Sequence, residues 1–182
     1  MKADITKTLV DEHRLILRMI TLLEKNAPRT ATGAYRNWQF YLDGIDFIRQ
    51  YADRFHHAKE EDVLFKALVD NGMPQEHSPV GAMLMEHDQG RAFVRAMEAA
   101  VLEAQAGSTD CYQAIADNTL GYAALLRDHI GKEDDILYPL AERVLPETMR
   151  PGILQGYQAA EAQVPAEFSN HYQTVVALYE QE

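Results

Sequence analysis

The chain has 182 residues, a length typical of one sizeable domain. Its 47% of hydrophobic and 25% of charged residues are ordinary for a globular protein and exclude disorder along most of the chain. The formal net charge of −11 makes nucleic acid and anionic membrane surfaces poor candidate partners. The single cysteine, Cys111, excludes an internal disulfide. We find no signal-peptide core after Met1 and no run of about 18 uncharged residues, so we expect a cytoplasmic protein.

Apolar residues recur at three- and four-residue steps in four long stretches, which predicts helices and no strands. The predicted helices span residues 4–25, 34–70, 79–106 and 109–145. Because short connections favour antiparallel neighbours, the sequence predicts an all-α, up-down-up-down four-helix bundle over residues 1–145. The less periodic residues 146–182 are predicted to form short additional helices packed on the outside of the bundle.

An internal repeat runs through the second and fourth predicted helices. Residues 56–65 (HHAKEEDVLF) align without gaps on residues 129–138 (HIGKEDDILY). The first and third helices carry the related tripeptides DEH at 11–13 and MEH at 85–87. The chain therefore has the pattern of two helical hairpins, each with a lone His and then a His-x-x-x-Glu motif, related by a pseudo-two-fold axis.

Six side chains of this pattern are candidates for a metal site. They are His13, His56, Glu60, His87, His129 and Glu133. Residues four apart lie on one helical face, so each His-x-x-x-Glu pair points at one place, and the lone histidines lie in the apolar stripes of the other helices. Taken singly, each His is more often a hydrogen-bonded core residue and each Glu a solvated one.

Together these residues point to bound cations. Two buried carboxylates that face each other are unfavourable, and paired divalent or trivalent ions would neutralise them. A mixture of carboxylate and imidazole without thiolate favours non-haem iron, with manganese or zinc behind. The motifs of a zinc peptidase and of a phosphate-binding loop are absent from the sequence.

These motifs resemble the hemerythrin-like di-iron (HHE cation-binding) family. The resemblance covers residues 4 to 145 and rests on DEHRLI (11–16), HHAKEEDVLF (56–65), MLMEHDQGR (83–91) and LLRDHIGKEDDILYPLA (125–141). It implies a four-helix bundle that holds two oxo- or hydroxo-bridged iron ions. It also implies that the six side chains named above are the ligands, with Glu60 and Glu133 as the bridges.

The chain departs from the oxygen-carrying hemerythrins at two places. Those proteins have a further His four residues from the third-helix ligand, where this chain has Met83 and Arg91. They also have an Asp five residues after the last His, whereas here Glu133 fits at four and Asp134 at five, which leaves the bridge ambiguous.

The absence of a fifth imidazole implies a more open coordination position, beside a space lined by Tyr122. It favours the binding or reduction of oxygen, peroxide or nitric oxide over pure oxygen storage. The alternative function is an iron- or oxygen-sensing module without turnover, in which the tail from Pro146 responds. The physiological ligand, the electron donor and the oligomeric state stay open.

The adjacent histidines 56 and 57 leave the orientation of the second helix to be decided. The stripe through His56 continues through apolar Ala52, whereas the face of His57 carries Asp53, so we expect His57 to face water or to lie outside the ligand set. One residue is about 100° of rotation on an α-helix, so both rings cannot point at the axis equally. The sequence therefore predicts that His56→Ala loses at least one iron and that His57→Ala keeps both.

Overall fold

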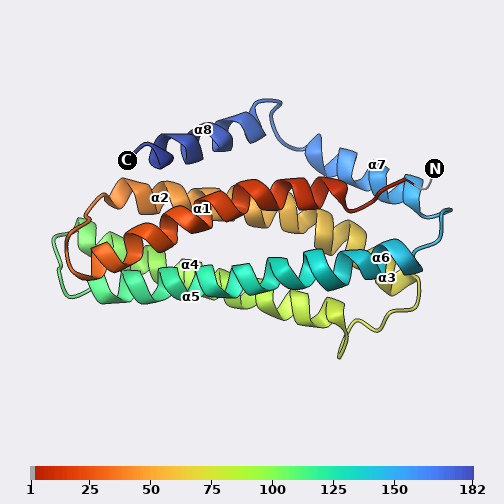
Figure 1. The fold of residues 1–182 in the computed structure, drawn as a ribbon, viewed down its shortest axis with the longest axis horizontal. Coiled ribbons are helices and arrows are strands. Elements are labelled where there is room, and N and C mark those ends of the chain that lie inside the picture. Colours follow the sequence, from red (N-terminus) through yellow and green to blue (C-terminus); the bar gives the residue numbers. More distant parts are fainter. Residues whose placement is uncertain (1–2) are drawn as a thin grey trace.

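The structure, a computed structural model, describes residues 3–182, and this part of the chain contains helices and turns but no strand. Four antiparallel helical rods form an up-down-up-down bundle, which confirms the predicted fold (Figure 1). The first rod is α1 (Lys7–Ala31) and the third is α4 (Pro79–Gln105). The second rod consists of α2 (Trp38–Phe47), η1 (Ile48–His57), η2 (Glu60–Phe65) and α3 (Lys66–Asp70). The fourth consists of α5 (Tyr112–Lys132), η3 (Glu133–Leu137) and α6 (Tyr138–Val144).

The ends of the rods follow local capping chemistry. Ser78 accepts a hydrogen bond from the Gly81 N–H at 3.2 Å, and Pro79 is the first residue of α4, as predicted. The first rod extends to Ala31, beyond the predicted end at residue 25, and includes Pro28. Because Pro28 lies in the last turn of α1, its missing N–H removes one hydrogen bond shortly before the helix would end.

Two of the rods change from α- to π-helical hydrogen bonding where the repeat lies. The second rod is π-helical over η1 and η2, and the fourth over η3. A π-helical turn holds more residues than an α-helical turn, so consecutive side chains are separated by less rotation than in an α-helix. Segments of this kind are rare and occur frequently at functional sites.

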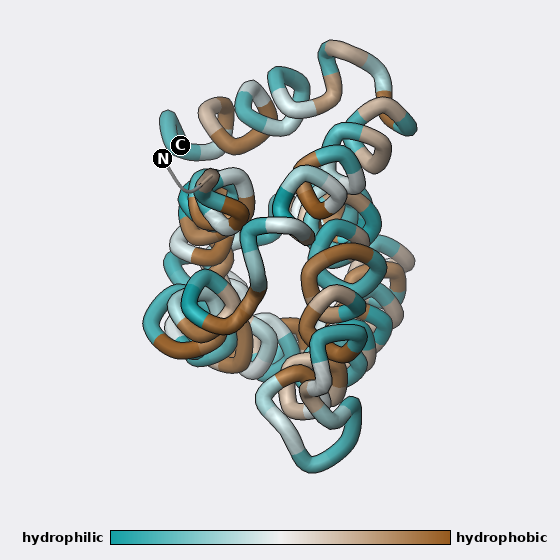
Figure 2. The backbone as a smooth tube through the Cα atoms, turned by 90° about the vertical axis from the view of Figure 1, so that its right-hand side faces the viewer, coloured by the Kyte–Doolittle hydropathy of each residue, from teal (hydrophilic) through white to brown (hydrophobic). Residues whose placement is uncertain are grey.

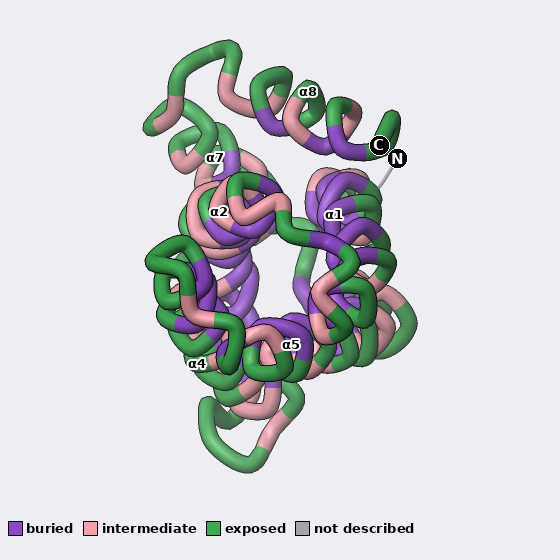
Figure 3. The backbone as a smooth tube through the Cα atoms, turned by 90° about the vertical axis from the view of Figure 1, so that its left-hand side faces the viewer, coloured by how far each residue is buried: buried purple, intermediate pink, exposed green. Residues whose placement is uncertain are grey.

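The backbone of buried residues runs along the inner side of the ring of rods and that of exposed residues along its outer side (Figure 3). The apolar residues form two clusters, one towards each end of the bundle. On the first rod, for example, Leu9 belongs to one cluster, Ile16 belongs to the other, and His13 lies between them. The candidate site residues therefore form a polar layer between two apolar cores.

The C-terminal helices α7 (Arg150–Glu161) and α8 (Phe168–Glu180) lie across the outside of the bundle, which is seen end-on in Figure 2. The first of them packs on η2 and the second on α1 and α2. Tyr172 donates a hydrogen bond to Asp46 at 2.8 Å, and Arg18 binds Glu180 through two hydrogen bonds. The division into a bundle of residues 1–145 and a tail of residues 146–182 stays a prediction. Among the described helices, none is long and apolar enough to cross a bilayer.

Candidate metal centre

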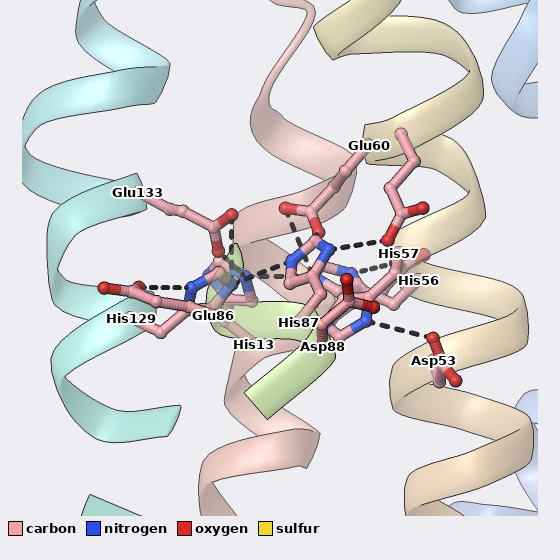
Figure 4. Close-up of polar contacts among 12 residues, drawn as sticks. His13, Asp53, His56, His57, Glu60, Glu86, His87, Asp88, His129 and Glu133 are labelled. Carbon is pink, nitrogen blue, oxygen red and sulfur yellow. Dashed lines mark hydrogen bonds and ion pairs between the residues drawn. The ribbon is translucent and has the colours of Figure 1, made fainter. Parts of the chain in front are cut away.

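The structure brings the six predicted site residues together in the polar layer (Figure 4). Each of them is at most 2% exposed. Their imidazoles form two pairs, and we call these the His13/His56 pair and the His87/His129 pair. Within each pair, the two Nε2 atoms are 3.0 Å apart. The rings of each pair therefore present nitrogen atoms to a common point.

The two glutamates lie between the histidine pairs. Oxygens of Glu133 lie 3.4 Å from Nε2 of His13 and 3.3 Å from Nε2 of His129. Oxygens of Glu60 lie 3.6 Å from the other Nε2 atom of each pair. Each carboxylate thus faces one imidazole of each pair, which is the arrangement in which a carboxylate can bridge two cations.

Three oxygens of these carboxylates have no hydrogen-bond donor, namely Oε2 of Glu60 and both oxygens of Glu133. An unpaired polar atom in the interior of a protein is costly, and an unpaired charge is more so. Imidazole nitrogens and carboxylate oxygens together are suitable donors for iron, manganese or zinc. The donor set of this layer therefore fits bound metal ions.

Each of the four imidazoles uses its other ring nitrogen, Nδ1, to bind an acidic side chain outside the layer. The pairs are His13 with Asp134 (2.8 Å), His56 with Glu12 (2.8 Å), His87 with Glu61 (2.7 Å) and His129 with Glu86 (2.9 Å). Because a carboxylate accepts and does not donate, each Nδ1 carries a proton, and in a neutral ring the Nε2 lone pair then points inward. Histidines that bind metals are held in the same way.

The sequence analysis missed these outer acidic residues, although the repeat contains a signal for them. A Glu precedes each lone His, and an acidic residue follows each Glu of the His-x-x-x-Glu motif. Their partners lie on other rods, so their role depends on how the rods pack. The structure also places Glu133 and Asp134 differently, since Glu133 faces the imidazoles and Asp134 binds the outer side of His13.

The electrostatics of the layer show a deficit of positive charge. Burial is the largest influence on Glu60, and together with the nearby Glu133 it raises the Glu60 pKa well above the usual value. Burial acts on Glu133 in the same direction, but the imidazoles of His129 and His13 close to its oxygens outweigh it and bring the Glu133 pKa well below the usual value. For His13, burial lowers the pKa, but the hydrogen bond to Asp134 and the nearby Glu133 carboxylate prevail and raise it to about 9. Two adjacent carboxyls thus compete for the few positive charges within reach.

A family model described as the hemerythrin HHE cation-binding domain matches residues 4–141 of the chain. The chain belongs to this family. The matched residues include three of the rods, the fourth as far as Ala141, and every member of the polar layer, so the HHE domain is a metal-binding domain with its His/Glu cluster in the bundle core. No curated protein and no solved structure matches the chain.

Of the two alternatives that the sequence left for His57, exposure to water is wrong, and a place outside the ligand set stays a prediction. This ring is 8% exposed and stacks on His87, with 3.6 Å between ring centroids and 10° between planes. One of its ring nitrogens lies within 4.8 Å of ligand atoms of Glu60, His87 and His129. The π-helical turn of η1 explains the difference, because it reduces the rotation between His56 and His57. The HHE domain therefore has a fifth imidazole at the site, from the second rod instead of the third.

Tyr138 is a second member of the site that the sequence analysis missed. Its hydroxyl donates a hydrogen bond to Oε1 of Glu60 and lies 3.4 Å from Nε2 of His13. Its ring stacks on His13 with 5.6 Å between centroids. The gapless repeat aligns Tyr138 with Phe65, which stacks on His87. The extra hydroxyl of Tyr138 is therefore a difference between the two halves that the sequence already contains.

A cavity of about 280 Å³ lies beside the His87/His129 pair, between η1, α4 and α5. Tyr122 lines it, as the sequence analysis expected for a space beside the metals, and His57 lines it as well. We call this cavity the side chamber. It gives the HHE domain a route from the surface to one half of its polar layer.

Proposed function

We propose that this HHE domain binds two metal ions, with iron preferred over manganese or zinc, and that the pair reacts with oxygen, peroxide or nitric oxide. The His13/His56 pair would hold one ion and the His87/His129 pair the other, with Glu60 and Glu133 between them. One observation carries the proposal: each buried carboxylate faces one imidazole of each pair, and three carboxylate oxygens have no donor. A donor set of nitrogen and oxygen without thiolate supports iron.

A pair of redox-active ions would supply electrons to a small oxidant. The chain's own residues then have separate tasks. The acidic side chains at the four Nδ1 atoms hold the imidazoles in the orientation and tautomer that bind metal. The Tyr138 hydroxyl holds a proton at Oε1 of Glu60, next to the His13/His56 pair. The side chamber admits small molecules at the opposite pair.

Metal content is the first test. Protein produced with iron and purified in air is analysed for metals and by optical spectroscopy, and metal-free protein is titrated with Fe²⁺ without oxygen. We expect two ions per chain and a near-ultraviolet absorption in air. The double variant Glu60→Gln/Glu133→Gln should bind neither ion, whereas His171→Ala, at an exposed position on α8, should bind both. A reproducible content of one ion or none contradicts the proposal.

Reactivity is tested separately on the loaded protein. Reduced protein is mixed with hydrogen peroxide, oxygen or nitric oxide, and the consumption of each is followed together with the optical spectrum. We expect peroxide to be consumed in proportion to the bound iron. Reversible oxygen binding without a reaction with peroxide would instead identify a carrier.

A sensing module is the second candidate, and one chain of contacts favours it. Glu12 accepts hydrogen bonds from His56 and from the fully buried Lys59, and the Lys59 ammonium lies 3.5 Å from Glu161 on α7. These contacts connect the polar layer to the C-terminal helices. Hydrogen exchange of residues 146–182 with and without metal tests this candidate. Faster exchange in the metal-free protein, without turnover of any oxidant, would favour sensing over reaction.

A further inference from the structure

The side chamber has a layered construction that follows from the register of its three rods. Its inner end is formed by buried His57, His87 and His129. Apolar side chains line its middle, and its outer side carries arginines of η1 and α4. These arginines are Arg49, Arg54, Arg91 and Arg95. Two carboxylates also line the chamber, namely Asp53, which binds Arg91, and Glu86, which binds His129 and Lys132. The chamber thus joins a histidine wall, through a largely apolar interior, to a rim in which arginines outnumber carboxylates.

The chamber is larger than oxygen, peroxide or nitric oxide requires. One water molecule needs a cavity volume of roughly 10–15 Å³, whereas the volume of the chamber is about 280 Å³. Tyr122 and His129 both line it and stand seven residues apart on α5, which is about 10 Å along the helix axis. Its shape therefore suits an elongated organic molecule.

Tyr122 offers an unused hydrogen-bond donor to the chamber. The residue is 3% exposed, and among the described residues its hydroxyl has no hydrogen-bond partner. Burial raises the Tyr122 pKa, so the hydroxyl keeps its proton and can donate. A nearly buried hydroxyl without a protein partner, in the wall of a cavity, is a donor for a ligand.

Two of the four rim arginines have no carboxylate partner among the described residues. Arg49 binds Glu98, and Arg91 binds Asp53 and Glu61. By contrast, the one side-chain bond of Arg54 within that part of the chain is a 3.4 Å contact with the Gln50 amide oxygen.

Arg95 makes no ion pair there and is exposed. In a chain of net charge −11, unneutralised guanidinium groups at one opening favour an anionic ligand.

Register places Tyr122 level with Gly90, whose Cβ would lie 3.5 Å from the Tyr122 ring, and places Arg95 further from the histidines along α4. Arg95 follows His87 by eight residues on α4, and Tyr122 precedes His129 by seven on the antiparallel α5. Val94, also in the lining, lies seven residues from His87. With guanidinium groups at its rim, a phenol in its wall and three imidazoles at its inner end, the chamber has two chemically different ends.

We infer that the side chamber binds a small organic carboxylate with an apolar chain, whose carboxylate contacts Arg95 and Tyr122 and whose chain extends towards His57, His87 and His129. Arg54 adds to the positive potential of the rim. The inference rests on the proposed function only for what happens at the histidine end, since binding itself needs no metal. It adds an organic acid, as a second molecule that reaches the centre, to the small oxidant of the proposed function.

Calorimetric titration with octanoate tests the inference. The protein is used as purified, loaded with redox-inert Zn²⁺, and free of metal where circular dichroism shows that it is folded. We expect octanoate to bind in each form, and butyrate and octanol to bind at least tenfold more weakly, because one lacks the chain and the other the charge. Failure of octanoate to bind the folded protein overturns the inference.

Variants locate the ligand within the chamber. Arg95→Gln and Tyr122→Phe should each weaken octanoate binding by about tenfold or more, because each removes a hydrogen bond to a charged group. Gly90→Leu should abolish binding, since a Cβ there lies 3.5 Å from the Tyr122 ring and a larger side chain extends into the chamber. Arg143→Gln, at an exposed position on α6 outside the lining, is the matched control and should leave binding unchanged.

The outcomes separate this inference from the proposed function. If the protein binds no metal pair but binds octanoate, and Arg95→Gln weakens that binding, the inference about the chamber is supported and the metal proposal is refuted. Two bound metal ions without octanoate binding do the reverse. Binding that needs metal and is insensitive to Arg95→Gln means that the carboxylate is a metal ligand, which overturns the orientation inferred here.

Discussion

The two halves of the metal centre are built from the same repeat but have different surroundings. We call the half with the His13/His56 pair the α1 half and the half with the His87/His129 pair the α4 half. In the α1 half, Glu12 accepts hydrogen bonds from His56 and Lys59. In the α4 half, Glu86 accepts the corresponding bonds from His129 and Lys132.

The difference lies in what covers these matched networks. The Lys59 side chain is fully buried beneath α7, where Glu161 approaches it, whereas the Lys132 side chain is 37% exposed. Tyr138 in the α1 half corresponds to Phe65 in the α4 half.

The α4 half also has His57, whose counterpart in the repeat is Ile130, and it faces the side chamber. The repeat therefore specifies the geometry of the candidate ligands in both halves. Residues outside the matched pattern make one half closed and the other accessible.

Removing the metal should destabilise both halves of the centre, and we expect it to have the largest effect on the free energy of unfolding. The metal-free layer keeps two buried carboxylates with unpaired oxygens, as in a broken buried ion pair. We therefore expect the free energy of unfolding to fall by about 3–5 kcal/mol. Denaturant unfolding of loaded and metal-free protein measures the difference. Equal midpoints in the two forms would contradict a structural role for the metal.

Matched lysine variants test whether burial of the outer network differs between the two halves. Lys59→Met leaves Glu12 buried without its cation and should cost about 3 kcal/mol. Lys132→Met removes a partly exposed ion pair and should cost less than about 1 kcal/mol. Urea unfolding of the two loaded variants checks the contrast. Similar losses in the free energy of unfolding for the two variants would mean that α7 does not shield the α1 half from solvent.

His57→Ala should act on the α4 half alone. The ring stacks on His87 and brings a nitrogen within 4.8 Å of the other candidate ligand atoms, so we expect its loss to weaken one metal by about 10- to 100-fold. Metal titration should show the second ion unaffected, and His171→Ala is the control. Two unchanged affinities would instead support the sequence-based prediction that His57 lies outside the ligand set.

Much of this centre was predictable from the sequence, because apolar spacing and short connections specify the bundle and the repeat specifies which positions are equivalent. That reasoning placed His13, His56 and Glu60 on inward faces without knowledge of their neighbours. It did not predict the burial of His57, because apolar spacing assumes α-helical rotation and does not report a change to π-helical hydrogen bonding.

The contacts between rods are the second feature that could not be predicted from the sequence. The partner of His13 is Asp134 and that of His56 is Glu12, and neither pair is close in sequence. The side chamber likewise depends on how η1, α4 and α5 pack. The sequence showed which residues repeat, but it did not show which repeated position faces which across the bundle.

The smallest expected effect comes from the pair Tyr138 and Phe65, and it tests the asymmetry directly. Tyr138→Phe removes the hydrogen bond to Oε1 of Glu60 while keeping the ring that stacks on His13. In the metal-free protein this leaves the buried carboxyl without a donor, which should cost about 1 kcal/mol. In the loaded protein the metal ions would bind the same carboxylate, so the cost should be smaller.

The reverse substitution, Phe65→Tyr, is the matched variant. By the pseudo-two-fold axis it directs a hydroxyl towards Glu133, whose two oxygens lack donors, so it should stabilise the metal-free form and leave the loaded form nearly unchanged. The double variant Phe65→Tyr/Tyr138→Phe would then transfer the hydrogen bond from one half to the other. Unfolding of all three variants, with and without metal, measures these differences. If Tyr138→Phe costs as much in the loaded as in the metal-free protein, the hydroxyl stabilises Glu60 independently of metal, and the asymmetry at this position is one of packing alone.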